Sequence, residues 1–295
     1  MNANKGLTRV DAIITVACIV LVLAQASIIN AGGRQRSKRE VCLANLRSLA
    51  AAWQTYSNDN SGKIPVGDVY YSWTFPAPGG TSGGPQLAWV EWPHPFPHSM
   101  PPTYSTNYSA SYPYSSPITQ AVWEHAIAEG TLWKYVGDYN IYRCSDGDKG
   151  SYVTYSMSQS LNCYPGAGGT GSLGNPPTIT KINQITKPAE KFVFLDTGII
   201  KRGAFFVVYS GSGSSAPGRW YDLPPMRHSQ GTTFAFADGH AIYRKWTDPH
   251  TLAAASGPWG GGTVDYCDCD LRWMTKITWG DVPYTCTNPN KHCEY

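Results

Sequence analysis

The first sixty residues constrain the fold of this chain more than any other stretch. Between Ala12 and Ala31 the sequence carries no charged residue, and about 20 apolar residues are what a helix needs to cross a bilayer. Between Arg34 and Tyr56 it contains neither Pro nor Gly, which favours a continuing helix. We therefore expect one long helix over 7–60, with its first part, about 7–31, in the membrane.

The second part of this expected helix is amphipathic. Its apolar residues recur at spacings of four, three, four and three, and they are Cys42, Leu46, Leu49, Trp53 and Tyr56. This spacing places them on one face of a helix, where they would pack against a folded head. The turn-forming cluster 58–62 is expected to end the helix.

The composition favours a loop-rich β structure outside the cytoplasm. Only 15% of the 295 residues are charged, against roughly 25% in ordinary globular chains, and the chain contains 11 Trp and 19 Tyr. Such a composition does not suit a cytosolic enzyme. The net charge of +3 is too small to indicate a nucleic-acid partner, and no basic patch interleaves with the aromatic residues.

The rest of the chain is expected to form a head over 61–250 and a Cys-rich tail over 251–295. Residues 65–117 are rich in Pro and Trp and show no period, which predicts a loop-rich insertion on the head. A helix is predicted over 118–128. Strands are predicted where Val, Phe and Tyr are frequent, over 151–157, 191–195 and 204–209. The predicted fold class is α+β, with the long N-terminal transmembrane and amphipathic helix packed on an antiparallel β-sheet.

The clearest hairpin signal lies near the end of the head. Two β-rich runs, 232–237 and 240–246, flank Asp238-Gly239. Asp-Gly favours a tight two-residue turn, because Gly accepts a positive φ. The first run alternates large with small residues, in the order Phe234, Ala235, Phe236, Ala237. We expect one face of this strand to be bulky and the other to admit close packing.

The cysteines indicate disulfides. Cys18 lies in the apolar run, and the seven candidates for disulfides are Cys42, Cys144, Cys163, Cys267, Cys269, Cys286 and Cys293. Cys267 and Cys269 would point the same way on a strand, so we expect them to pair with Cys286 and Cys293. Cys144 could pair with either Cys42 or Cys163. The alternative for the tail is a zinc site that includes His292.

The N-terminal layout resembles that of type IV pilins and pseudopilins. The resembling features are Gly6 before the apolar run, the lone carboxylate Asp11 five positions later, and the amphipathic stripe. The resemblance implies that a prepilin peptidase removes a leader, residues 1–6, by cutting between Gly6 and Leu7, and methylates the new N-terminus. The class usually has Phe and Glu where this chain has Leu7 and Asp11. An uncleaved signal anchor or a signal peptide is the alternative.

A second resemblance covers the end of the head. Arg227-His228, Gly231 and Asp238-Gly239-His240 are similar to the C-terminal signature of prepilin-type H-x9-DG proteins of planctomycete type. Segments 42–46 and 132–144 are also similar to that family, whereas the Pro/Trp-rich insertion and the tail fall outside it. The resemblance implies membership of a pilus or secretion system and supplies no reaction.

Metal-binding and catalytic signals are weak. A Ca²⁺ ion could bind at His228 and Asp238, or in the tail at Asp265, Asp268 and Asp270, since carboxylates are ligands of hard cations. The alternative is structural, because Asp238 begins a turn. The sequence has no Gly-x-Ser-x-Gly elbow, no P-loop and no His-Glu-x-x-His motif, so we expect no enzymatic activity and no certain cofactor.

The function that these features predict is structural. The chain is expected to be a subunit of a type IV pilus-like filament or a type II secretion pseudopilus, with Asp11 pairing with the N-terminal amine of a neighbouring copy. Its expected partners are copies of itself, the prepilin peptidase, the inner-membrane assembly machinery and the membrane. The head would lie in the periplasm before assembly and in an extracellular filament afterwards. The alternatives are a membrane-anchored extracellular protein that binds a glycan or protein through 65–117, and an anchored hydrolase.

Overall fold

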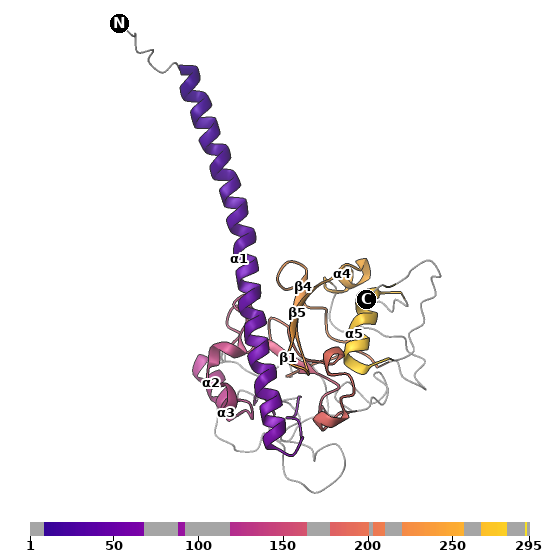
Figure 1. Cartoon of the computed structure of the whole chain (residues 1–295). Helices are drawn as coiled ribbons and strands as arrows, with labels where there is room; N and C mark the ends of the chain where they lie inside the picture. The colour runs from indigo at the N-terminus through magenta and orange to yellow at the C-terminus, as the bar shows by residue number, and fades with distance from the viewer. Residues whose placement is uncertain are drawn as a thin grey trace.

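The structure is a computed structural model that describes residues 9–67, 88–91, 119–163, 178–200, 203–209, 220–256, 267–281 and 293. Within the first helix, side chains 10–12 and 21–32 lie outside the described part. A long helix projects from a head built around one β-sheet, and its N-terminal end lies far from that head (Figure 1).

The long helix α1 (Arg9–Asp59) contains 51 residues, about 75 Å at 1.5 Å per residue. The predicted stripe is confirmed, because Cys42, Leu46, Leu49 and Trp53 are fully buried. The helix ends where the sequence predicts. Gly62, with a φ of 80°, donates its amide hydrogen to the carbonyl of Ser57 at 2.8 Å, so a residue that tolerates positive φ closes the last turn.

The transmembrane part of the prediction is wrong for this structure. Among the described residues, no helix is both long enough and apolar enough to cross a membrane.

The sheet has five strands in the order β3-β1-β2-β4-β5. They are β1 (Tyr155–Ser158), β2 (Phe192–Asp196), β3 (Ala204–Phe205), β4 (Gly231–Phe236) and β5 (Ala241–Lys245). The predicted antiparallel sheet is wrong at one edge, where β3 pairs with β1 in parallel. The chain reverses after β2, which is antiparallel to β1. It then runs along the far edge of β1 in the same direction as β1.

The β4–β5 hairpin is present, with a turn one residue longer than predicted. Ala235 pairs with Ala241, and the amide of Phe236 donates to the carbonyl of His240 at 2.9 Å. Three residues, 237–239, therefore form the loop, and Gly239 ends it with a φ of 93°. A three-residue hairpin loop commonly closes with a residue in this left-handed region.

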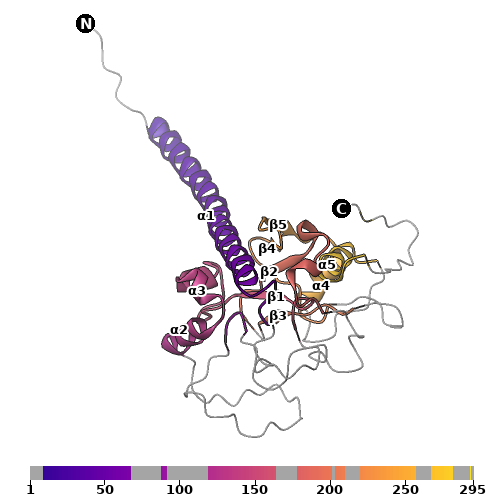
Figure 2. The ribbon, with the colours of Figure 1, turned by 60° about the horizontal axis from the view of Figure 1, so that its bottom comes forward.

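The sheet separates two cores (Figure 2). On one face lie α1 and the short helices α2 (Gln120–Glu129), α3 (Trp133–Val136) and η1 (Tyr139–Tyr142). On the other lie α4 (Pro249–Ala254) and α5 (Cys269–Trp279). Phe234 and Phe236 belong to the α5-side core, and Ala235 and Ala237 to the α1-side core. This confirms the predicted bulky and close-packed faces of β4.

The described part of the tail contains the helix α5 (Cys269–Trp279). Cys269 is the first residue of α5, not part of the expected strand, and it forms a disulfide with Cys293. Cys267 is also disulfide-bonded.

Two short helices, η2 (Ile182–Gln184) and η3 (Pro188–Glu190), precede β2. Of the predicted insertion 65–117, only 65–67 and 88–91 are described, and Trp89 in it is fully buried.

Candidate metal centre

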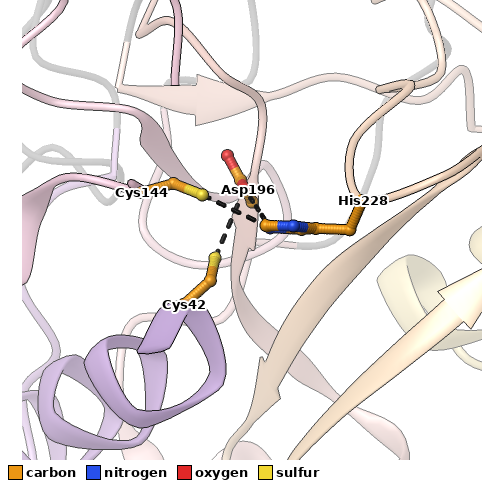
Figure 3. A group of neighbouring side chains, drawn as sticks. All are labelled: Cys42, Cys144, Asp196 and His228. Carbon is orange, nitrogen blue, oxygen red and sulfur yellow. Dashed lines mark hydrogen bonds and ion pairs between the residues drawn. The ribbon is translucent and has the colours of Figure 1, made fainter. Parts of the chain in front are cut away.

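Four segments that are distant in the sequence bring four metal-ligating side chains together between α1 and the sheet. They are Cys42 on α1, Cys144 after η1, Asp196 at the end of β2, and His228 in the turn before β4. One donor atom of each lies within 4.8 Å of the others, and all four residues are buried. Figure 3 shows the four side chains pointing toward a common centre.

The donor atoms form a compact group. Asp196 Oδ2 lies 3.3 Å from Cys42 Sγ and 3.3 Å from His228 Nε2. His228 Nε2 also lies 3.3 Å from Cys144 Sγ. The other ring nitrogen, Nδ1, has no hydrogen-bond partner among the described residues, so Nε2 makes the polar contacts of this imidazole.

Cys42 is held by the packing of α1 and by two hydroxyl groups of the sheet. It is the first residue of the buried stripe on α1. The hydroxyl of Tyr155 in β1 donates to its Sγ at 3.3 Å, and Thr233 Oγ1 in β4 lies 3.0 Å from the same sulfur. The sheet therefore surrounds this thiol with polar groups, although the rest of the stripe is apolar.

Asp196 and Cys144 are fixed by backbone amides. The amide of Gly198 donates to Asp196 Oδ1 at 2.9 Å, which leaves Oδ2 for the cluster. The amide of Asp146 donates to Cys144 Sγ at 3.3 Å, and the amide of Cys144 donates to Thr154 Oγ1 at 2.6 Å. Backbone amides thereby help to orient both side chains.

His228 sits in a strained turn. Arg227 and Gly231 exchange two backbone hydrogen bonds, of 2.6 and 2.9 Å. The residues between them, 228–230, have φ values of 46°, 71° and 66°. Left-handed conformations of non-glycine residues cost about 1–3 kcal/mol each and cluster at functional sites. A Cβ at Gly231 would collide with the carbonyl oxygen of Arg244, so the glycine permits the close approach of β5 that closes this turn.

Contacts within the cluster shift the pKa values of Cys42, Cys144 and His228. Burial, together with the hydrogen bond to Cys144 and the charge of Asp196, raises the pKa of Cys42. The hydrogen bond from Cys42 lowers the pKa of Cys144 against the effect of burial. Burial alone would lower the pKa of His228, but hydrogen bonds with Asp196 and Cys144 outweigh it and raise this pKa to about 9.

Two kinds of chemistry use such residues. A thiol beside an imidazole can act as a nucleophile, and two thiols, an imidazole and a carboxylate can ligate a metal. All four side chains are buried, so a substrate has no access to the sulfur atoms in this structure. Cys42 and Cys144 are thiols and form no disulfide. Metal ligation therefore fits the geometry better than nucleophilic catalysis.

The structure separates the residues of the predicted calcium sites. His228 precedes β4 and Asp238 follows it, so the six residues of this strand separate them, about 20 Å at 3.4 Å per residue. Asp238 is instead hydrogen-bonded to His240, with 2.6 Å between Oδ1 and Nδ1. Gly239 lies in the hairpin loop.

In the tail, the predicted carboxylates accept hydrogen bonds. Asp268 caps the N-terminus of α5 by accepting from the amide of Leu271 at 2.9 Å. Asp270 accepts from the amides of Thr247 and Asp248 at 2.6 and 2.8 Å. These oxygen atoms are directed at N–H donors of the protein.

Several predicted residues lie outside the described part of the chain. These are Gly6, Leu7, Asp265, Cys286 and His292, together with the side chain of Asp11. Cys163 is a buried thiol that belongs to a separate core cluster, so neither alternative for a Cys144 disulfide is formed.

Asp196 is the site residue that sequence reasoning did not single out. It ends the apolar run of β2, and it is fully buried. An acidic residue directly after a buried strand was the signal available, because a buried carboxylate requires a partner. Cys42 and Cys144 were predicted only as disulfide candidates, and His228 as a possible Ca²⁺ ligand together with Asp238.

Comparisons of this chain with protein-family models, with curated proteins and with solved structures found no match.

Proposed function

We propose that this chain is a structural, pilin-like subunit that assembles with further copies of itself through α1. The observation that carries the proposal is the contrast along α1. Its C-terminal part is buried on the head, whereas Ile13, Ile14, Val16, Ile19 and Val20 are between 53% and 69% exposed. Five large apolar side chains in succession are costly to leave in water, because each contributes about 1.5–3 kcal/mol when it is buried.

The occupant of this apolar segment follows from its symmetry. At 100° per residue, positions 13, 14, 16, 19 and 20 span an arc of about 220° of the helix surface. So wide an apolar face is buried only against more than one neighbour. A bundle of the same segment from several copies supplies such surroundings, whereas a single flat partner surface covers one side. Assembly would thus bury α1 in the centre and leave the heads outside.

The resemblance to pilins supplies the remaining parts of this proposal. A prepilin peptidase would cut between Gly6 and Leu7, and dedicated assembly machinery would add the processed subunit. Asp11 would pair with the N-terminal amine of a neighbouring copy, since a carboxylate inside a bundle needs a partner. The disulfide between Cys269 and Cys293 supports a location outside the cytoplasm, in the cell envelope or in an extracellular filament.

The test compares assembly of three forms of the full-length chain. One is the wild type, one carries Ile13→Ser and Ile19→Ser, and the control carries Val41→Ser. Val41 is also apolar and 48% exposed on α1, but it lies beside the buried stripe that contacts the head. Electron microscopy and sedimentation velocity measure the yield of filaments or oligomers at matched concentration.

We expect the wild type and Val41→Ser to assemble alike, and the double variant to lose at least about tenfold in yield, since each serine removes roughly 1.5–3 kcal/mol of apolar burial per subunit. A wild-type chain that stays monomeric at every concentration would overturn the proposal. Equal loss in the control and the double variant would show that the segment 13–20 is not the assembly surface.

A further inference from the structure

We infer that Cys42, Cys144, Asp196 and His228 bind one zinc ion, which fastens α1 to the head. The inference concerns the fold of each subunit and stands independently of assembly. It rests on the type of the four donors, the distances between them, the groups that surround them, and the segments that they join.

The donor set selects the class of metal. It contains two sulfur atoms, one imidazole nitrogen and one carboxylate oxygen. Ca²⁺ and Mg²⁺ are hard cations that bind oxygen ligands. Zn²⁺ binds cysteine sulfur, histidine nitrogen and carboxylate oxygen, and four protein ligands are typical of its structural sites.

The distances agree with tetrahedral coordination. A zinc ion with bonds of about 2.3 Å to sulfur and about 2.0 Å to nitrogen or oxygen is surrounded by a tetrahedron with edges of about 3.3–3.8 Å. The distances from Asp196 Oδ2 to Cys42 Sγ and to His228 Nε2, and from His228 Nε2 to Cys144 Sγ, are each 3.3 Å. The other three donor–donor distances are within 4.8 Å, so inward shifts of up to about 1 Å would place all four donors at bonding distance.

The surrounding groups are those that a zinc thiolate site uses. Ligand sulfur and oxygen atoms in such sites accept hydrogen bonds that orient them. Here the hydroxyl of Tyr155 donates to Cys42 Sγ, the amide of Asp146 to Cys144 Sγ, and the amide of Gly198 to Asp196 Oδ1. These donors would hold the ligand atoms in their orientation around a bound ion.

The ion would compensate most of the negative charge of the site. Two thiolates and one carboxylate carry three negative charges, and Zn²⁺ supplies two positive ones. Arg227, which pairs with Asp148 at 3.1 Å, also lies near the site, with its Nε 4.0 Å from Asp196 Oδ1. On binding, the two thiols and a protonated His228 release their protons to the solvent, and the ion takes their place.

The site joins parts of the chain that are far apart in the sequence. Cys42 is 154 residues from Asp196, and Cys144 is 84 residues from His228. Four protein ligands leave no open position for a substrate, which is typical of a structural metal and not of a catalytic one. The ion would set the register of α1 on the sheet and hold the strained turn 228–230 in place.

The test measures metal in the full-length chain, purified with its disulfides intact, loaded with zinc and then dialysed. The variants are Cys144→Ser and His228→Gln. The matched control is Cys163→Ser, because Cys163 is a buried thiol outside the cluster whose Sγ lies 3.5 Å from the carbonyl of Leu161. We expect about one zinc per chain in the wild type and the control, and at least a hundredfold weaker binding in the two variants, since even outer-shell changes cost about 10–100-fold.

A second measurement does not depend on the folding of any variant. In the wild type reconstituted with Co²⁺ in place of zinc, we expect the charge-transfer absorption of two thiolates bound to cobalt in a tetrahedral field. A wild type that holds no metal under these conditions would overturn the inference. So would a Cys42–Cys144 disulfide found by mass mapping of the native protein, or a Cys163→Ser variant that loses zinc as fully as Cys144→Ser.

Discussion

The two faces of the sheet are closed by different means. On the α5 face, Phe234 and Phe236 of β4 belong to a core cluster with large residues of α5, among them Trp273. On the α1 face, Ala235 of β4 and Ala237 of the hairpin loop belong to the cluster that contains the buried stripe of α1. Two neighbouring residues of one strand thus serve two kinds of core. The large Phe side chains fill the space between the sheet and α5, whereas the small Ala side chains let α1 approach the sheet closely.

The buried polar groups of the two faces also differ. On the α5 face, the carboxylates of Asp268 and Asp270 accept hydrogen bonds from backbone amides, so they are satisfied within the protein. On the α1 face, two buried thiols, a carboxylate and an imidazole contact one another. Among the described residues, the α1 face thus gathers metal-ligating groups around one point, whereas these two carboxylates of the α5 face are directed at backbone amides.

The largest expected effect comes from emptying the aromatic core on the α5 face. Phe234 is fully buried, and its ring contacts those of Phe192, Trp246 and Trp273, with centroids 5.8, 6.0 and 5.1 Å away. Phe234→Ala should lower the free energy of unfolding by about 3–5 kcal/mol, through lost burial and the cavity left behind. Urea unfolding of the full chain measures this.

The control for Phe234→Ala is Ile199→Ala, because Ile199 is 41% exposed. Its expected cost is under about 0.5 kcal/mol. A Phe234→Ala variant that unfolds at the wild-type urea concentration would show that the α5 face does not depend on aromatic packing.

The sequence predicted the parts of this comparison that depend on local periodicity. The stripe from Cys42 to Trp53 and the Phe–Ala alternation in β4 each follow one helical or strand period, and the structure contains both. The parallel direction of the edge strand β3 cannot be predicted from hydrophobic periodicity, because it depends on the path of the chain after β2. The helix α5 was missed although Asp268 is a good N-cap, because its cysteines suggested a strand.

The candidate metal centre was predictable only in fragments. Its four residues come from segments that meet in three dimensions, and no local spacing connects Cys42 with Asp196. The turn at 228–230 was also hidden, because three consecutive left-handed residues are not expected where the sequence offers no glycine or asparagine among them. Such exceptions to local rules are expected at functional sites.

The next effect concerns a buried cation on the α5 face. Lys191 is 9% exposed, and its Nζ donates to the carbonyl of Thr278 at 2.5 Å. Burial lowers its pKa from 10.5 to about 8. Between these pH values the unfolded chain binds a proton that the folded chain does not, so stability should rise with pH. Between pH 8 and 10.5 the free energy of unfolding should rise by roughly 3 kcal/mol, at about 1.4 kcal/mol per pH unit. This stabilisation is lost again as the pH falls through 8.

The measurement for Lys191 is the difference in unfolding free energy between the wild type and Lys191→Met. Urea titrations at pH 7.5, 9 and 10.5 give this difference, in which the titration of all other groups cancels. We expect the unfolding free energy of the wild type to rise relative to that of Lys191→Met as the pH increases over this range. A difference that does not change with pH would show that Lys191 keeps its ordinary pKa, so that the α5 face admits water near Thr278.

The smallest of the three effects is expected on the α1 face, from adding bulk where the sheet is close to α1. Ala235 is fully buried and belongs to the same core cluster as Leu46, Leu49 and Trp53. Ala235→Leu would force α1 away from β4 or into poor rotamers, at a cost of about 1–3 kcal/mol. The same change should loosen the zinc site, since Thr233 and Cys42 Sγ, 3.0 Å apart, lie on the two elements that would separate.

Urea unfolding with and without zinc measures both effects, and we expect zinc to stabilise Ala235→Leu less than it stabilises the wild type. Equal stabilisation of the two proteins by zinc would mean that α1 does not need close contact with β4 to complete the site, and the difference between the two faces would then be one of packing alone.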